Sequence, residues 1–190
     1  MFVMGVDPGL TRCGYGVLEW EGDENRSLHT SSTSTASTSS GAKVVAAGVI
    51  STDRDLTLPA RLAQLQEEFS QLLKEFVPTV VVVERVVFQT NALTAMAVGQ
   101  ASGIALACAY RAGCQVVEYS ANEVKMAVTG YGAADKISVQ SMVSNLLKLT
   151  VEPKPPDVAD ALALALCHVF TLPFRKAADR ATGIGRRHGM

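Results

Sequence analysis

The stretch Val80-Val81-Val82-Val83-Glu84 determines the fold class expected for this chain of 190 residues. Four consecutive β-branched side chains are typical of a strand that is buried on both faces, as in a parallel sheet covered by helices. An acid at the end of such a strand is costly to desolvate unless a partner or a cation compensates its charge. The stretch therefore predicts an α/β fold and marks Glu84 as a candidate functional residue.

Three strands are expected before this one. Residues 2–6 form a short apolar run that ends at Asp7-Pro8-Gly9, where proline and glycine favour a turn. Residues 11–20 and 43–52 are rich in β-branched and aromatic side chains, which suit a pleated sheet. Short connections predict that these three strands form an antiparallel meander. Apolar residues at helical spacing then predict a helix over residues 58–76.

Strands and helices alternate in the remainder of the chain. The expected elements are a helix rich in small residues at 90–112, a strand at 115–119, a short helix capped by Ser120, a helix at 135–149 with Ile137 facing inward, and an apolar helix from Asp157 to about Phe170. This order is that of a ribonuclease H-like fold, with a mixed five-stranded sheet flanked by helices. Fold alone does not determine function.

The chain is long enough for one domain with its own core, expected over residues 1–172. Within it, residues 27–42 are rich in Ser and Thr, cannot bury apolar surface, and predict a flexible loop. Residues 173–190 form a basic C-terminal tail, which either contacts DNA through its charge or is a disordered terminus.

Composition narrows the partners and the compartment. A formal net charge of −1 and a pI near 6.3 exclude a uniformly basic surface, so any DNA contact needs a local concentration of Lys and Arg. The four cysteines have no CxxC spacing, which favours reduced, buried thiols in a cytoplasmic protein. No basic leader precedes the first strand, and no uncharged apolar run is long enough for a bilayer, so we expect no membrane association.

Three further acids join Glu84 as candidates. Asp7 ends the first strand, and Asp157 and Asp160 lie three residues apart in the first turn of the last helix, on one face. If the first and fourth strands are neighbours, these side chains converge. Carboxylate oxygens select Mg²⁺ or Mn²⁺, and two such ions can clamp the oxygens of a phosphoryl transfer. The alternatives are a turn-forming Asp7, a helix-capping Asp157 and a solvated Asp160.

A series of motifs resembles the RuvC family of Holliday-junction resolvases, in order and at compatible spacing, over about residues 2–170. The motifs are Gly5-Val6-Asp7-Pro8-Gly9, Gly14-Tyr15-Gly16, Glu84-Arg85-Val86, Gly99-Gln100-Ala101, Glu123-Val124-Lys125, the stretch from Gly130 to Lys136, and the stretch from Asp157 to Ala163. The ordered set is specific, although each motif alone is weak.

The resemblance implies roles for individual residues. Asp7, Glu84, Asp157 and Asp160 match the metal-binding catalytic acids, and the resemblance implies two Mg²⁺ ions, replaceable by Mn²⁺, in each site. Lys125 and Lys136 match basic residues that contact DNA phosphate or, for Lys136, assist catalysis, and Phe88 matches an aromatic that stacks on a base at the crossover. Without the resemblance, the lysines are ordinary surface residues and Phe88 is a core residue. His168 is expected to pack in the last helix.

The resemblance also implies a homodimer that binds a four-way junction and makes paired, symmetric nicks with 5′-phosphate and 3′-hydroxyl ends. Its partners would be the branch-migration proteins RuvA and RuvB. Three other functions share some of these features: a ribonuclease H-like nuclease acting on another nucleic acid, an actin-like sugar kinase or ATPase, and a junction-binding protein without catalysis. A junction-binding protein would not need four acids that repel phosphate, and the chain is too short for two actin-like lobes.

Overall fold

The valine-rich strand β4 (Val80–Glu84) lies inside a five-stranded sheet, between β1 (Phe2–Asp7) and β5 (Gln115–Tyr119), and runs parallel to both. A computed structural model of the chain describes residues 1–22, 41–86 and 92–182, with side chains as far as Phe174 except that of Leu93. The neighbouring positions of β1 and β4 confirm the pairing on which convergence of the acids depends.

The first three strands form the predicted antiparallel meander. Strand β2 (Arg12–Trp20) pairs with β1 on one side and with β3 (Ala42–Ser51) on the other, which gives the sheet order β3-β2-β1-β4-β5. The sheet is therefore mixed, and the expected α/β class with a five-stranded mixed sheet is confirmed.

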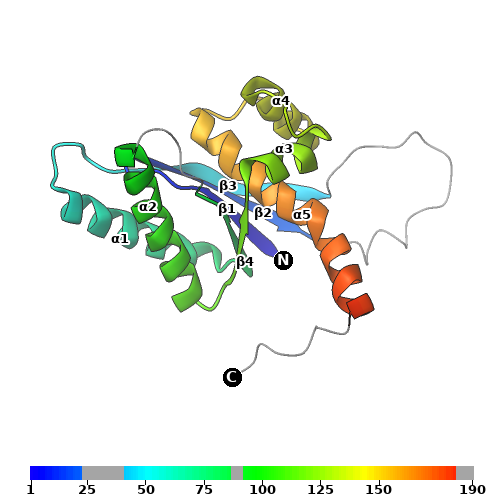
Figure 1. Cartoon of the computed structure of the whole chain (residues 1–190), viewed down its shortest axis with the longest axis horizontal. Helices are drawn as coiled ribbons and strands as arrows, with labels where there is room; N and C mark the ends of the chain where they lie inside the picture. The colour runs from blue at the N-terminus through cyan, green and yellow to red at the C-terminus, as the bar shows by residue number, and fades with distance from the viewer. Residues whose placement is uncertain (23–40, 87–91, 183–190) are drawn as a thin grey trace.

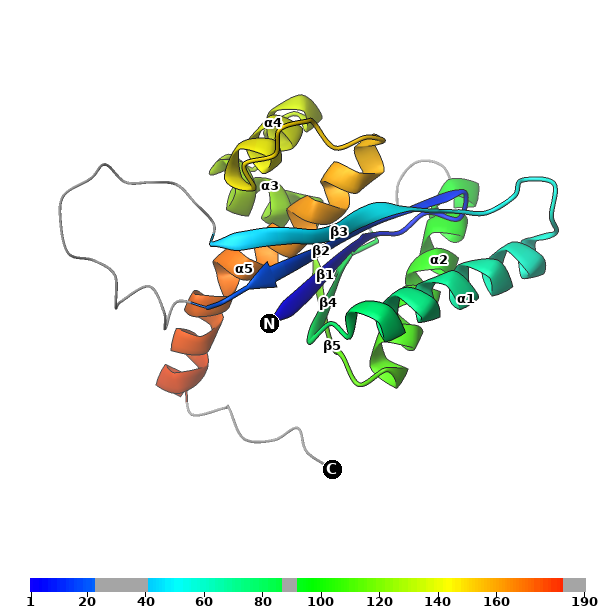
Figure 2. The same ribbon diagram turned by 180° about the vertical axis from the view of Figure 1, so that it is seen from behind.

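Helices cover both faces of this sheet, as Figure 1 and the reverse view in Figure 2 show. On one face lie α1 (Leu58–Phe76) and α2 (Ala92–Arg111). The other face carries α5 (Pro156–Thr182), and α3 (Ala121–Thr129) and α4 (Lys136–Leu146) pack against α5.

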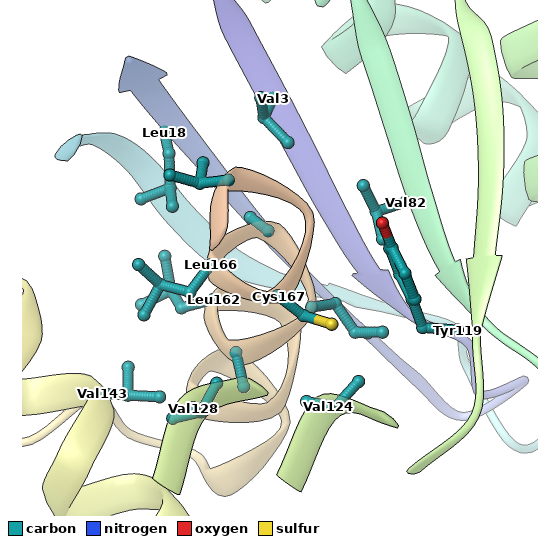
Figure 3. Close-up of a cluster of buried hydrophobic side chains, with 14 of the residues drawn as sticks. Val3, Leu18, Val82, Tyr119, Val124, Val128, Val143, Leu162, Leu166 and Cys167 are labelled. Carbon is teal, nitrogen blue, oxygen red and sulfur yellow. The ribbon is translucent and has the colours of Figure 1, made fainter. Parts of the chain in front are cut away.

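The alternation of side chains along β4 explains why its sequence is apolar throughout. Val80 and Val82 belong to the core cluster around α5, whereas Val81 and Val83 belong to the cluster beneath α1 and α2. Figure 3 shows the α5 cluster, in which Val82 of β4 and Leu162 of α5 belong to the same core. All four valines are at most 2% exposed, so the predicted double burial is confirmed.

Glycines in β1 and β2 allow α5 to approach the sheet closely. A Cβ atom at Gly5 would overlap the carbonyl oxygen of Ala161, and one at Gly14 would overlap the carbonyl oxygen of Asp157. At Gly16 it would lie 2.7 Å from Leu162 Cδ2. The glycines therefore set the depth at which the first turns of α5 rest on the sheet.

The structure corrects the expected end of the last helix. The sequence pattern predicts that the helix ends near Phe170 and that a tail begins at residue 173, but α5 continues to Thr182. The apolar spacing stops where the helix leaves the core, so it marks the packed part of the helix and not its end. Residues 183–190 of the predicted tail, and residues 27–40 of the predicted Ser/Thr loop, lie outside the described residues.

One stretch of α5, Pro156–Phe174, is long and apolar enough by length and composition to cross a membrane. Its mean hydropathy is 1.5, and 61% of it is buried inside the structure. A central helix that packs against a sheet on one side and two helices on another needs the same apolar composition.

Candidate active site

Two of the predicted acids meet at the ends of β1 and β4. Val6 is opposite Val83 in the parallel register, so Asp7 and Glu84 come next on adjacent strands at the same edge of the sheet. Both are partly buried. The strands themselves therefore position this pair.

The first turns of α5 bring the other two acids to the same place. Gly14, whose missing side chain makes room for the Asp157 backbone, is the β2 residue that pairs with Asp7. Asp157 and Asp160 both lie in the first turns of the helix and are also partly buried. The structure thus brings all four predicted acids together from three separate segments of the chain.

Burial and mutual repulsion make Asp7 difficult to ionise. Burial raises the pKa of Asp7 from its ordinary value of 3.8 to about 7, and the charges of Asp160, Glu84 and Asp157 add to the rise. Lys136 acts in the opposite direction. The positive charge around Asp7 is therefore too small to compensate this carboxyl group and its three acidic neighbours.

Glu84 is affected in the same way. Burial raises its pKa, the charge of Asp160 raises it further, and Lys136 again lowers it. Glu84 and Asp7 therefore share the same two neighbours, an acid of α5 and a lysine of α4.

Two basic side chains partly neutralise the group. Lys136 Nζ lies 2.6 Å from Asp160 Oδ2, and the hydrogen bond to Asp160 raises the pKa of Lys136. Arg12 Nη2 lies 3.1 Å from Asp157 Oδ2, on the side of β2. Two cations against four acids leave a net negative charge at the site.

A cavity of about 220 Å³ opens beside the acids, between α3, α4 and α5. Its walls include two of the acids, both predicted lysines and several apolar side chains. The lining residues are Glu84, Ala121, Val124, Lys125, Lys136, Val139, Asp160, Ala163 and Leu164. Lys125 and Lys136 therefore lie beside Glu84 and Asp160 of the acidic group.

The donor chemistry of the site fits divalent cations. Its oxygen donors are four carboxylates, which suit hard ions such as Mg²⁺ and Mn²⁺, and the raised pKa of Asp7 reports a shortage of positive charge. Among the described residues, no three His, Cys, Asp or Glu side chains are already arranged as a metal-binding group. Lys136 and Arg12 hold two of the carboxylates instead, so ion binding requires these side chains to rearrange.

Sequence reasoning missed the arginines that hold the turn after Asp7. Arg61 of α1 donates to Thr11 Oγ1 at 2.8 Å and to Thr52 Oγ1 at 3.0 Å. It thereby ties the β1–β2 turn to the end of β3, while Arg12 of the same turn pairs with Asp157. Helical spacing identifies the buried residues of α1 but gives no signal for a polar contact across 50 residues of sequence.

Two other predicted residues have different outcomes. His168 is 1% exposed and packs against Tyr119, whose hydroxyl lies 3.1 Å from His168 Nδ1, so the expectation of a packed histidine is confirmed. Phe88, predicted to stack on a base, lies outside the described residues.

The cysteines agree with the expectation of reduced thiols. Cys13, Cys108, Cys114 and Cys167 all lie among the described residues and form no disulfide, and three of them are buried.

Comparisons with known proteins agree on one family. The family model for the crossover junction endodeoxyribonuclease RuvC matches residues 3–168. The crossover junction endodeoxyribonuclease RuvC of Streptomyces avermitilis is 43% identical over 189 residues, covering 100% of this chain and 98% of the relative.

Solved structures give the same result. The structure of Thermus thermophilus RuvC aligns with a TM-score of 0.76 at 32% identity, covering 92% of this chain and 97% of that one. The structure of T. thermophilus RuvC in complex with a Holliday junction substrate aligns with a TM-score of 0.79 at 32% identity, covering 92% of this chain and 96% of that one. The ribonuclease H-like fold expected from the order of elements is confirmed.

Proposed function

Because this chain belongs to the RuvC family of crossover junction endodeoxyribonucleases, we propose that it is a structure-specific endonuclease that resolves Holliday junctions in recombination and repair. In this proposal it makes paired, symmetric nicks that leave 5′-phosphate and 3′-hydroxyl ends. The observation that supports the chemistry is the convergence of four carboxylates, with the pKa of Asp7 raised to about 7, at one edge of the sheet.

Asp7, Glu84, Asp157 and Asp160 would hold two Mg²⁺ ions, or Mn²⁺ in their place. Divalent ions in such a site supply charge stabilisation and water activation for phosphodiester hydrolysis. The strand ends position Asp7 and Glu84, whereas Asp157 and Asp160, now paired with Arg12 and Lys136, would have to give up these partners to hold the ions. The four acids are carried by three segments, β1, β4 and the first turns of α5, and such regular elements suit the precise positioning that catalysis requires.

The two lysines of the cavity would bind DNA phosphate beside the acids. Lys136 has an exposed side chain (61%), so its ammonium group can reach a phosphate once Asp160 binds an ion. We assign Lys136 a catalytic role as well, since its charge opposes that of the acids around the scissile phosphate. A net charge of −1 for the whole chain makes such local positive groups necessary for DNA binding. Phe88 remains, by resemblance, the proposed stacking residue at the crossover.

A homodimer would place two sites on the two symmetric strands of a four-way junction. The outer face of α2 is the proposed interface, because it exposes Met96 and Tyr110 at 60% and 79%, and a Cβ added at Gly99 or Gly103 meets nothing within 4 Å. The protein would act in the cytoplasm, with RuvA and RuvB as its branch-migration partners.

Cleavage assays test the proposal. A synthetic mobile four-way junction, a linear duplex and an RNA–DNA hybrid are each incubated with the protein in Mg²⁺ and in EDTA. We expect cleavage of the junction alone, and only in Mg²⁺. Asp7→Asn should lower the rate at least about 100-fold, because it removes one metal ligand, whereas Asp53→Asn in an exposed loop should not. Preferred cutting of the hybrid, or full activity of Asp7→Asn, would exclude this function.

A further inference from the structure

We propose that Arg61, in the first turn of α1, is a positioning residue for the metal-binding acids and acts through Thr11 and Thr52. It reaches Asp7 and Asp157 by way of the turn at residues 8–11. This inference rests on the proposed function and adds to it a residue outside the acidic group that sets the affinity of the site for divalent cations.

The Arg61 cluster, made of Arg61, Thr11 and Thr52, joins three segments of the chain. Arg61 Nη2 donates to Thr11 Oγ1 at 2.8 Å, and its Nε donates to Thr52 Oγ1 at 3.0 Å. Thr52 is 5% exposed; its hydroxyl donates to the carbonyl oxygen of Leu10, and its N–H donates to that of Thr11 at 3.2 Å. These hydrogen bonds tie the turn after Asp7 to the end of β3 and to the start of α1.

The shape of the turn transmits this hold to the acidic group. The turn begins directly after Asp7 and ends at Arg12, whose Nη2 lies 3.1 Å from Asp157 Oδ2. A Cβ added at Gly9 would overlap the carbonyl oxygen of Arg12, so the turn is tightly closed on itself. A displacement where Arg61 holds the turn therefore moves both of its ends, and with them two of the proposed metal ligands.

The acids need such a restraint because they repel one another. Burial and then the charges of its three acidic neighbours raise the pKa of Asp7 to about 7. Without ions, this repulsion favours conformations in which Asp7 moves away from the acids of α5. Groups outside the ligand set that fix the orientation of a ligand typically change metal affinity about 10-fold or more. A turn held by Arg61 keeps Asp7 where a cation can bind it.

Arg61 acts through its position and not through its charge. It is not among the charged groups that shift the pKa of Asp7 or Glu84, whereas Lys136 lowers both. The planar fork of a guanidinium group presents several donors in a fixed geometry. Here the fork spans two hydroxyl oxygens on different segments, which is the arrangement expected of a group that fixes one segment against another.

Thr11 and Arg61 offer variants that break the cluster with little change in shape. Thr11→Val removes the oxygen that accepts from Arg61, and Thr11→Ser is its matched control because it keeps the hydroxyl. Arg61→Met removes both donors but leaves the hydroxyl of Thr52 bonded to Leu10, so we expect the fold to persist. Lys74→Met, at an exposed residue in the last turn of the same helix, is the control for losing a cation from α1.

The first experiment measures Mn²⁺ affinity without DNA, from the electron paramagnetic resonance of free Mn²⁺. We expect Thr11→Val and Arg61→Met to bind Mn²⁺ about 10-fold more weakly than the wild type, and Thr11→Ser and Lys74→Met to bind it normally. Because both variants break one interaction, the double variant should be no more than about twofold weaker than Arg61→Met. Independent effects would multiply to about 100-fold.

The second experiment separates metal binding from DNA binding. Junction affinity in EDTA, measured by fluorescence anisotropy, should be unchanged in Thr11→Val and Arg61→Met. In cleavage assays the Mg²⁺ concentration that gives half of the maximal rate should rise about 10-fold, and excess Mg²⁺ should restore most of the rate. A general structural defect would instead lower the rate at every Mg²⁺ concentration.

Three outcomes overturn the positioning role alone: multiplying effects in the double variant, unchanged Mn²⁺ affinity in both single variants, or weaker junction binding by Arg61→Met in EDTA with normal Mn²⁺ affinity. The last would make Arg61 a DNA contact. A wild type that neither binds Mn²⁺ nor cuts junctions overturns the proposed function as well. If Arg61→Met unfolds, the pair Thr11→Val and Thr11→Ser decides the same question, since it changes one hydroxyl group.

Discussion

At the residue scale, Asp7 combines partial burial with three acidic neighbours, and this combination makes the stability of the metal-free protein depend on pH. The pKa of Asp7 in the folded chain is about 7, above its ordinary value of 3.8, so the folded state binds this proton more tightly than the unfolded state does. Stability from this group is present below about pH 4 and is lost as the pH rises to about 7.

Asp7→Asn removes the ionisation and should therefore stabilise the metal-free protein at pH 8. We expect an increase of about 2 kcal/mol, or roughly 5 °C in Tm, which shrinks as the pH is lowered towards 4. Thermal unfolding in EDTA at several pH values measures it, with Asp53→Asn as the control. An Asn variant that is less stable than the wild type at pH 8 would contradict the raised pKa.

Lys136 is expected to have opposite effects on ion binding and on cleavage. Its ammonium group is 2.6 Å from Asp160 Oδ2 and so competes with a cation for that carboxylate. Lys136→Met should tighten Mn²⁺ binding about fivefold, since an exposed ion pair is worth up to about 1 kcal/mol. The same change should slow junction cleavage at least tenfold, because the proposed phosphate contact is lost.

Electron paramagnetic resonance of free Mn²⁺ measures this affinity without any reaction. Lys125→Met is the control, because Lys125 lines the same cavity but is not among the groups that shift the pKa of Asp7 or Glu84. Weaker Mn²⁺ binding by Lys136→Met would mean that the lysine supports the site and does not compete for it.

Individual residues were predictable from sequence where the chain itself gives them an unusual position. Glu84 after four valines and Asp7 after an apolar strand stand out because acids rarely end buried strands without compensation. Arg12 and Arg61 do not stand out, because a polar contact between distant segments produces no regular spacing of residues in the sequence. The candidate acids could thus be identified from the sequence. The pairing of Asp157 with Arg12 and of Asp160 with Lys136 depends on side-chain distances that only the structure supplies.

At the element scale, the contact between β2 and α5 predicts a large effect from a single added carbon. In Gly14→Ala the new Cβ would overlap backbone of Asp157, so the helix must shift. We expect a loss of about 2 kcal/mol or more and a strong loss of cleavage, since Asp157 moves with the helix. Chemical unfolding and the junction assay measure the two effects.

Gly48→Ala in β3 is the matched control for that change. The three atoms nearest to its new Cβ all belong to the ring end of Tyr15, the closest at 2.8 Å, and the end of a side chain can move away where backbone cannot. We expect less than about 1 kcal/mol of destabilisation and retained cleavage. Equal losses in the two variants would show that the close approach of α5 has no special role.

The helices and strands were predictable where their buried positions produce a regular spacing of apolar residues in the sequence. Strand β4 and the capped start of α3 agree with expectation because each follows from local chemistry. The expected inward position of Ile137 is wrong: it is 75% exposed, because Val139 and Val143 form the buried face of α4 and a residue two positions before Val139 lies on the opposite side of the helix. The end of α5 was misplaced because the apolar spacing covers only the part of the helix that packs in the core, whereas the helix continues to Thr182.

At the scale of the whole molecule, the exposed face of α2 predicts self-association. Gly103→Arg places a charge on that face, where there is open space around the glycine within the chain. We expect the wild type to be a dimer at micromolar concentration by light scattering and the variant to be a monomer with an unchanged circular dichroism spectrum. Ile137→Arg, at an exposed apolar residue of α4, is the control and should stay dimeric.

Gly103→Arg also tests whether the two nicks in a junction are made together by a dimer or singly by separate monomers. On a supercoiled plasmid with an extruded cruciform, coordinated nicks by a dimer linearise the plasmid, whereas isolated nicks only relax it. Gly103→Arg should shift the product from linear to nicked circles. A wild type that is monomeric at micromolar concentration would contradict the symmetric arrangement.

The parallel pairing of β1 with β4 and the docking of α5 on both β1 and β2 carry a consequence for synthesis on the ribosome. Asp7 leaves the ribosome early, whereas Asp157 and Asp160 lie in a helix made near the end of the chain. Residues so far apart in sequence come together only once the intervening chain has been made and folded. A nascent chain that has not yet released α5 lacks two of the four proposed metal ligands, so we expect an unfinished copy to be unable to cut DNA during translation.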